Sequence, residues 1–380
     1  MNRQKSSPRF RFAGAALLLV LLMFLVPALR EGDRRLYLLA ALVPGCLLLC
    51  MTLLARVFSL DRFLLSLTLV LCGIGIAALA LTDPDAVVAQ SLRCAVGLGV
   101  LVLGSILARS LNGSLLTALI SGFLGVLLLA AKLLASSLTL PLSGIGLALL
   151  LVSFAALLSS GRTLGALIPG IAGTALLVTG YGIVPALIWS LTFLMLLWAA
   201  DGSLVTLLAG GLLAGTLLLV VHWFGASSVP VPAAEQAAPA LPGLVSAGWI
   251  GADQLPEGMT AGSVSLFSLL SAHYGLPFAG LTVLLFLPLF QRGAFIAGIS
   301  RSRFHAVLAM GCSLLPALQV LAALLSVFGF LSLPECSFPL LTLSLPELCA
   351  GMLLPGMLCG ISGRNAAELE DDAHLAMLAH

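Results

Sequence analysis

The stretch FLLSLTLVLCGIGIAALAL, residues 63–81, decides the fold class of this chain. It contains no charged residue and lies between Asp61-Arg62 on one side and Asp83 on the other. A helix of about 20 apolar residues crosses the hydrocarbon core of a bilayer. In that core, backbone groups find hydrogen-bond partners only within a helix or a closed barrel. Because the apolar residues run on without polar alternation, the stretch predicts a spanning helix and not a barrel strand.

Apolar runs of this kind recur along the whole chain. Hydrophobic residues make up 61% of the sequence and charged residues 8%, whereas a soluble domain has about 25% charged residues. We therefore predict an all-α polytopic membrane protein with about twelve transmembrane helices. The spans are expected near 12–29, 36–55, 63–81, 91–108, 115–133, 140–158, 164–179, 183–199, 203–222, 263–290, 305–328 and 338–361. Around Gly180-Tyr181-Gly182 the pattern fits either a turn between two spans or one broken helix.

The basic residues predict the orientation of the spans. Arg3, Lys5, Arg9 and Arg11 precede the first apolar run, and cytoplasmic ends of spans collect Lys and Arg. An even number of spans then places both termini in the cytoplasm. The long polar segment 223–262 contains no Lys or Arg and is expected to form an extracellular loop between helices nine and ten. A net charge of +2 is too small to indicate a nucleic-acid partner, so the lipid bilayer is the expected surroundings.

Few residues in this chain could carry chemistry. Charges within spans are costly and are functional hypotheses by default, and Glu347 lies in the last expected span. In the long loop Asp253 and Glu257 can act as acid or base. His273 and Tyr274 begin about one turn below the outer end of the tenth span. No cysteine pair has CxxC spacing, so neither a disulfide framework nor a zinc site is predicted.

The order of motifs in the second half resembles the SEDS family, the shape, elongation, division and sporulation proteins of the FtsW, RodA and SpoVE type. LPEGMT (255–260), FSLL (267–270) and YGL (274–276) resemble the family's LPE-x-HTDFIF…EELG stretch. Gln319 and FPLLT (338–342) follow in the order of the family's ending. The resemblance covers about residues 57–363, which would form a transmembrane core. Residues 1–56 would be an N-terminal extension with two transmembrane helices, and residues 364–380 an acidic cytoplasmic tail.

This resemblance implies a role in bacterial cell-wall synthesis. Members of the family polymerise lipid II, an undecaprenyl-linked precursor of peptidoglycan, in the bacterial cytoplasmic (inner) membrane. They usually act beside a transpeptidase, a class B penicillin-binding protein, in cell shape, division or sporulation. The resemblance implies a multi-pass peptidoglycan glycosyltransferase. With the polar residues of the spans, it leaves His273, Tyr274, Gln319 and Glu347 as candidate substrate-binding residues.

The acidic residues of the family's motifs are replaced in this chain. The catalytic aspartate of the loop motif falls at Ala261 when aligned from its start, or at Val264 when aligned back from Gly275. The acid of the family's Q-P-S-E motif falls at Gly144, and the aspartate of its D-L-G motif falls at Gly182. The sequence therefore fits a divergent member that lacks the family's catalytic aspartate.

Three functions remain open from the sequence. A divergent glycosyltransferase would use Asp253 as a substitute base, oriented by Glu257, and a divalent metal ion would replace the missing basic clamp on the leaving diphosphate. A catalytically degenerate relative would bind a lipid precursor or act as a scaffold for a membrane partner. A transporter of another family would bind its substrate at a broken helix near the midplane, for which the break at 180–185 and Glu347 are the support.

Overall fold

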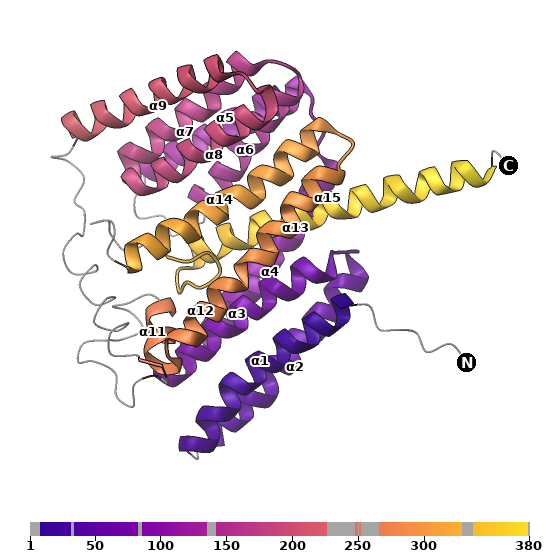
Figure 1. Cartoon of the computed structure of the whole chain (residues 1–380), viewed down its shortest axis with the longest axis vertical. Coiled ribbons are helices and arrows are strands. Elements are labelled where there is room, and N and C mark those ends of the chain that lie inside the picture. Colours follow the sequence, from indigo (N-terminus) through magenta and orange to yellow (C-terminus); the bar gives the residue numbers. More distant parts are fainter. Residues whose placement is uncertain are drawn as a thin grey trace. The chain divides into compact units, whose positions relative to one another are not determined.

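The computed structural model describes residues 8–31, 34–82, 86–134, 142–225, 248–249, 251, 266–328 and 337–378. These residues form α-helices joined by short turns, and no strand is found among them (Figure 1). Within the same residues, nine helices are long and apolar enough to cross a membrane by length and composition. The prediction of an all-α polytopic membrane protein is confirmed. The total of twelve spans and the extracellular position of the long loop stay predictions, as does the division into residues 1–56, 57–363 and 364–380.

The chain divides into two compact units, and the first contains most of the N-terminal helices. Its helices are α1 (Pro8–Glu31), α2 (Arg34–Val57), α3 (Arg62–Thr82), the first part of α4 (Ala86–Ser110), α11 (Leu266–Tyr274), α12 (Leu276–Leu284) and the beginning of α13 (Phe286–Ile299). Helix α3 contacts α1, α2 and α11. Gly73 lets the first two approach, because a Cβ there would meet Leu47 and Val20 at 2.7 and 3.1 Å. In lipid the hydrophobic effect does not drive helices together, and small residues instead allow the close van der Waals packing that holds them.

The second unit is built around α6 (Leu142–Ser159) and α8 (Ile183–Asp201). Helix α6 contacts α5 (Leu115–Leu134), α7 (Thr163–Gly180), α14 (Arg303–Val327) and α15 (Leu345–Leu378), and α8 contacts α7, α9 (Leu204–Gly225) and α14. Small residues again set the spacing, since a Cβ at Gly125 would lie 2.9 Å from the carbonyl oxygen of Gly146. The hydroxyl of Ser153 donates across the same pair of helices to the carbonyl of Ala118 at 2.7 Å.

The segment around Gly182 is a turn between two helices and not a break within one. Helices α7 and α8 pack against each other, and the turn consists of Tyr181 and Gly182 (Figure 1). The amide of Tyr181 closes α7 by donating to the carbonyl of Leu177 at 2.8 Å. Gly182 then adopts a φ of +97°, a backbone conformation that residues other than glycine rarely adopt. The question that the sequence left open is therefore decided in favour of two helices.

The tenth expected span, residues 263–290, is wrong in its boundaries. Gly275 adopts a φ of +84° and ends α11, and Pro277 begins the next helix. The stretch that is long enough to span runs from Leu276 to Ile299 through α12 and α13. His273 and Tyr274 thus lie on the short helix α11, ahead of the span.

The last expected span, residues 338–361, begins later than its hydropathy indicates. Residues 338–344 are not helical, and Leu340 among them has a φ of +71°. Helix α15 starts only at Leu345 and continues to Leu378, so the acidic tail extends the same helix. Glu347 therefore occupies the first turn of α15.

Candidate functional site

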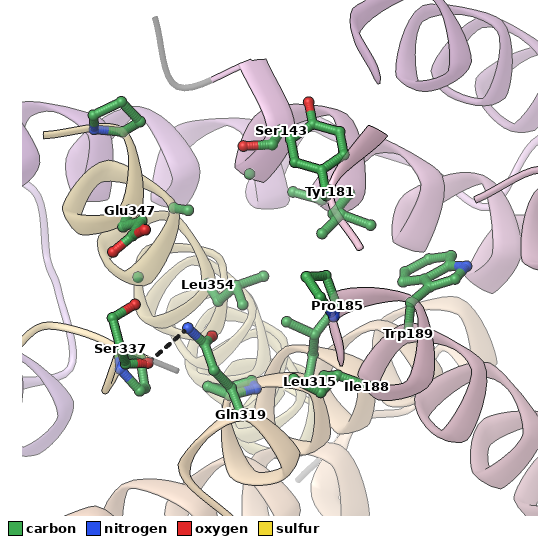
Figure 2. A pocket seen from close by; sticks show the side chains of 18 of the residues that line it. Ser143, Tyr181, Pro185, Ile188, Trp189, Leu315, Gln319, Ser337, Glu347 and Leu354 are labelled. Atoms are coloured by element: carbon green, nitrogen blue, oxygen red, sulfur yellow. Dashed lines mark hydrogen bonds between the residues drawn. The ribbon is translucent and has the colours of Figure 1, made fainter. Parts of the chain in front are cut away.

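A cavity of about 420 Å³ lies in the second unit, lined by α6, α7, α8, α15 and the middle of α14 (Figure 2). This volume is within the usual range of small-molecule sites, about 300–1,000 Å³. Its hydrogen-bonding side chains come from five places in the sequence: Ser143, Tyr181, Gln319, Ser337, Ser344 and Glu347. The helices converge so that residues as far apart in the sequence as Ser143 and Leu354 line one space.

Ser143 and Tyr181 form one polar side of the cavity. Ser143 lies in the first turn of α6, and Tyr181 occupies the turn after α7. Burial raises the pKa of the Tyr181 phenol, and a hydrogen bond with Ser143 opposes that shift. The phenol is therefore neutral near pH 7 and keeps a hydroxyl proton that it can donate.

Gln319, Ser337 and Glu347 form the other polar side (Figure 2). The Gln319 amide donates from Nε2 to the carbonyl oxygen of Ser337 at 3.3 Å, which orients the side chain. Glu347 is exposed and stands in the first turn of α15, where the partial positive charge of a helix N-terminus favours a carboxylate. This side presents a carboxylate beside an amide.

The remaining wall is apolar and includes a fixed aromatic ring. Trp189 is 1% exposed, and its indole N–H donates to the carbonyl oxygen of Gly170 at 2.9 Å. Gly173 makes room for the ring, because a Cβ there would lie 2.8 Å from the indole carbon Cε2. Leu315 and Leu354 line the cavity farther from the helix ends.

The lining residues lie at different distances from the ends of their helices. At about 1.5 Å of rise per residue, Ser143 and Glu347 lie within about one turn of a helix end. Leu354 lies nine residues into α15, or about 14 Å from its start. Gln319 lies eight residues before the end of α14, or about 12 Å from it, so polar and apolar lining residues both occur at this depth.

The charge of the lining is negative. Glu347 is the only acidic side chain among the lining residues, and that described set contains no Lys, Arg or His. Gly144, where the sequence comparison expected an acid, packs against α15 so closely that a Cβ there would overlap Ala350. A larger side chain at this position would displace α15.

The structure assigns different places to the predicted site residues. Gln319 and Glu347 both line the cavity. Asp253 and Glu257 lie outside the described residues. His273 and Tyr274 belong to the first unit, where the Tyr274 hydroxyl donates to the carbonyl of Met23 at 2.8 Å. The buried Nε2 of His273 has no hydrogen-bond partner among the described residues.

Sequence reasoning did not select Ser143, Tyr181, Ser337 or Trp189 as site residues. Tyr181 had a usable signal, because an aromatic residue between two glycines at a turn is often held there by a contact. Ser143 and Ser337 are single serines in apolar surroundings, and such residues are common in membrane helices as packing contacts. Three or more His, Cys, Asp or Glu that could hold a metal are not found together within the described residues.

This fold is similar to that of solved structures. The RodA rod-shape-determining protein of Thermus thermophilus is similar at 16% identity and a TM-score of 0.53, over 81% of this chain and 98% of RodA. The chain has the fold of RodA. A RodA mutant with one aspartate replaced by alanine matches at 18% identity and a TM-score of 0.53, over 80% and 97% of the two chains.

A further solved chain is similar to this one. It comes from a peptidoglycan synthase complex that coordinates polymerization and crosslinking, and it matches at 19% identity with a TM-score of 0.56, over 81% of this chain and 98% of its own. No protein-family model and no curated protein matches the sequence. At these identities the similarity establishes the RodA fold.

Proposed function

We propose that this protein acts in bacterial cell-wall synthesis as a multi-pass protein of the cytoplasmic membrane that binds lipid II or a related undecaprenyl-linked precursor and polymerises its sugars. The observation that carries the proposal is the 420 Å³ cavity among the helices of a RodA-like fold. The outer leaflet holds such a precursor with its sugars in water and its tail in the bilayer. A cavity lined by both polar and apolar side chains suits that ligand.

The chemistry of sugar transfer assigns roles to the available residues. Joining two lipid-linked sugars requires a base for the attacking hydroxyl and stabilisation of the leaving diphosphate. Asp253, oriented by Glu257, is the proposed base, and a divalent metal ion is the proposed counter-charge for the diphosphate. Glu347 and Gln319 are the proposed substrate-binding residues, because both side chains line the cavity.

The experiment is in vitro polymerisation of purified lipid II by the full-length protein in nanodiscs, with Mg²⁺ or Mn²⁺. We expect glycan strands from the wild type, loss of at least about 100-fold in rate for Asp253→Ala, and normal rates for Glu370→Gln. Glu370 is an exposed acid on α15 outside the cavity lining, so it is a matched control for general effects of charge. Equal rates for Asp253→Ala and wild type would refute the role of Asp253.

A second candidate is a relative that binds the precursor without polymerising it. The specific observation in its favour is the contact between Gly144 and Ala350, which occupies the place where the resemblance expects an acid. The absence of Lys, Arg and His from the described lining also favours it, because nothing there stabilises a leaving diphosphate. Such a protein would give photo-crosslinks to a diazirine-labelled lipid II but no polymer under any of the metals.

The wider assignment follows from the same proposal. Both termini would be cytoplasmic, and a class B penicillin-binding protein is the proposed transpeptidase partner. A transporter receives less support, because transporters bind substrate at broken helices, and the segment around Gly182 is a turn between α7 and α8. Uptake of lipid precursor into sealed vesicles without polymerisation or crosslinking would favour the transporter.

A further inference from the structure

The electrostatics of the cavity bear on which part of a lipid-linked precursor it accepts. The described lining carries one carboxylate, Glu347, and no Lys, Arg or His. A diphosphate carries at least two negative charges near neutral pH. Like charges repel, and a desolvated anion without a paired cation is strongly disfavoured. The lining is therefore unsuited to hold a diphosphate directly.

The sequence extends this point to four of the segments that the structure does not describe. Residues 135–141, 226–247, 252–265 and 329–336 contain no Lys and no Arg. Two of these segments continue directly from cavity helices, since 135–141 precedes α6 and 329–336 follows α14. None of these connections can supply the guanidinium or ammonium that usually binds phosphate.

The groups that are present fit an uncharged ligand rich in hydroxyl and amide groups. The Glu347 carboxylate and the Gln319 amide oxygen accept hydrogen bonds, whereas the Ser143 and Tyr181 hydroxyls both donate and accept. Gln319 is already oriented by its bond to Ser337. Apolar surface from Pro185 and Ile188 lies beside these groups and can cover the apolar face of a sugar ring (Figure 2).

We infer that the cavity binds the N-acetylated sugar portion of the precursor, with Glu347 accepting a hydrogen bond from a sugar hydroxyl or amide, and that the diphosphate stays outside the lining. This inference rests on the proposed function and specifies which part of the ligand the site recognises. It also gives Glu347 a binding role that is separate from the base assigned to Asp253.

The test uses soluble probes that separate the two parts of the precursor. Full-length protein in nanodiscs is titrated with the N-acetylglucosamine disaccharide chitobiose and, separately, with sodium pyrophosphate, and binding is followed by ligand-observed NMR. We expect chitobiose to bind the wild type and Glu370→Gln equally. Glu347→Gln should bind it about tenfold more weakly, because a hydrogen bond to a charged acceptor is lost at an exposed position. Thermal unfolding curves that coincide for the three proteins show that the variants are folded.

Each outcome decides between the inference and the proposed function. Chitobiose binding that depends on Glu347 and survives excess pyrophosphate supports the inference. Pyrophosphate binding that Glu347→Gln strengthens, with no chitobiose binding, overturns it but leaves precursor binding intact. No binding of either probe, with lipid II still crosslinking to cavity residues, also overturns it. If lipid II itself fails to crosslink, the proposed function fails as well.

Discussion

Gly173→Ala tests the packing that shapes the cavity wall. The backbone of Gly173 lies against the indole of Trp189, and a Cβ there would approach indole carbon Cε2 to 2.8 Å and Leu150 Cδ1 to 3.1 Å. The ring cannot retreat freely, because it is 1% exposed and its N–H donates to the Gly170 carbonyl at 2.9 Å. The added methyl must therefore displace the ring or separate α7 from α8.

The expected loss follows from two terms. Overpacking a tight interior costs about 1–3 kcal/mol, and leaving the buried indole N–H and its acceptor without partners costs about 1–3 kcal/mol. If the ring moves away, the overpacking is relieved but the indole hydrogen bond is lost. We therefore expect Gly173→Ala to lower the free energy of unfolding by about 2–4 kcal/mol, less than the full sum.

The assay is reversible unfolding in mixed micelles followed by circular dichroism. Gly211→Ala is the matched control, because a Cβ at Gly211 in the neighbouring helix α9 meets nothing within 4 Å. The loss for Gly173→Ala should shrink by half or more in a Trp189→Phe background, where the smaller ring leaves room and donates no hydrogen bond. A loss that is equal in both backgrounds, or no larger than that of Gly211→Ala, would refute the described packing of α7 against α8.

Three further predictions concern other contacts in the two units. Gly182→Ala should cost about 1–3 kcal/mol in the same unfolding assay, because its φ of +97° strains an L residue although a Cβ would meet nothing within 4 Å. Unchanged stability would show that the turn has another conformation. Tyr274→Phe removes the bond to the Met23 carbonyl and should cost about 0.5–1.5 kcal/mol, with faster hydrogen exchange in α1 around Met23; exchange that stays at the wild-type rate would contradict the contact. Arg364→Gln removes an ion pair with Glu368 at 3.0 Å, but both side chains are 31% exposed, so the loss should stay below about 1 kcal/mol and diminish in high salt. A loss several times larger would mean that Arg364 has a structural role beyond this pair.

Much of the fold could be predicted from the sequence because length and hydropathy are local properties. The run 63–81 became the buried helix α3, Arg62–Thr82, with ends displaced by one residue. Boundaries failed where a local backbone preference interrupted an apolar run. Gly275 divides the tenth expected span, and the turn that contains Leu340, with a φ of +71°, precedes the start of α15. Hydropathy does not register either feature, because both lie among apolar side chains.

The candidate site could be predicted only in part. Glu347 and Gln319 attracted attention because polar side chains in apolar runs are rare and expensive. The same reasoning selected His273 and Tyr274, which belong to the other unit. Ser143 and Tyr181 were not selected, because a serine or a tyrosine near a helix end is ordinary in a membrane protein.

By itself the sequence determined that this chain forms apolar helices, because a bilayer leaves the backbone no other way to satisfy its hydrogen bonds. Only the tertiary structure decided which helices surround the cavity and that Glu347 and Gln319 face the same space. The physical reason is that lipid and helix surfaces are equally apolar, so hydropathy does not select partners. Helix partners are selected by shape: the missing side chain of Gly173 leaves room for Trp189, and that of Gly144 leaves room for Ala350. Such contacts between distant residues become visible only in three dimensions.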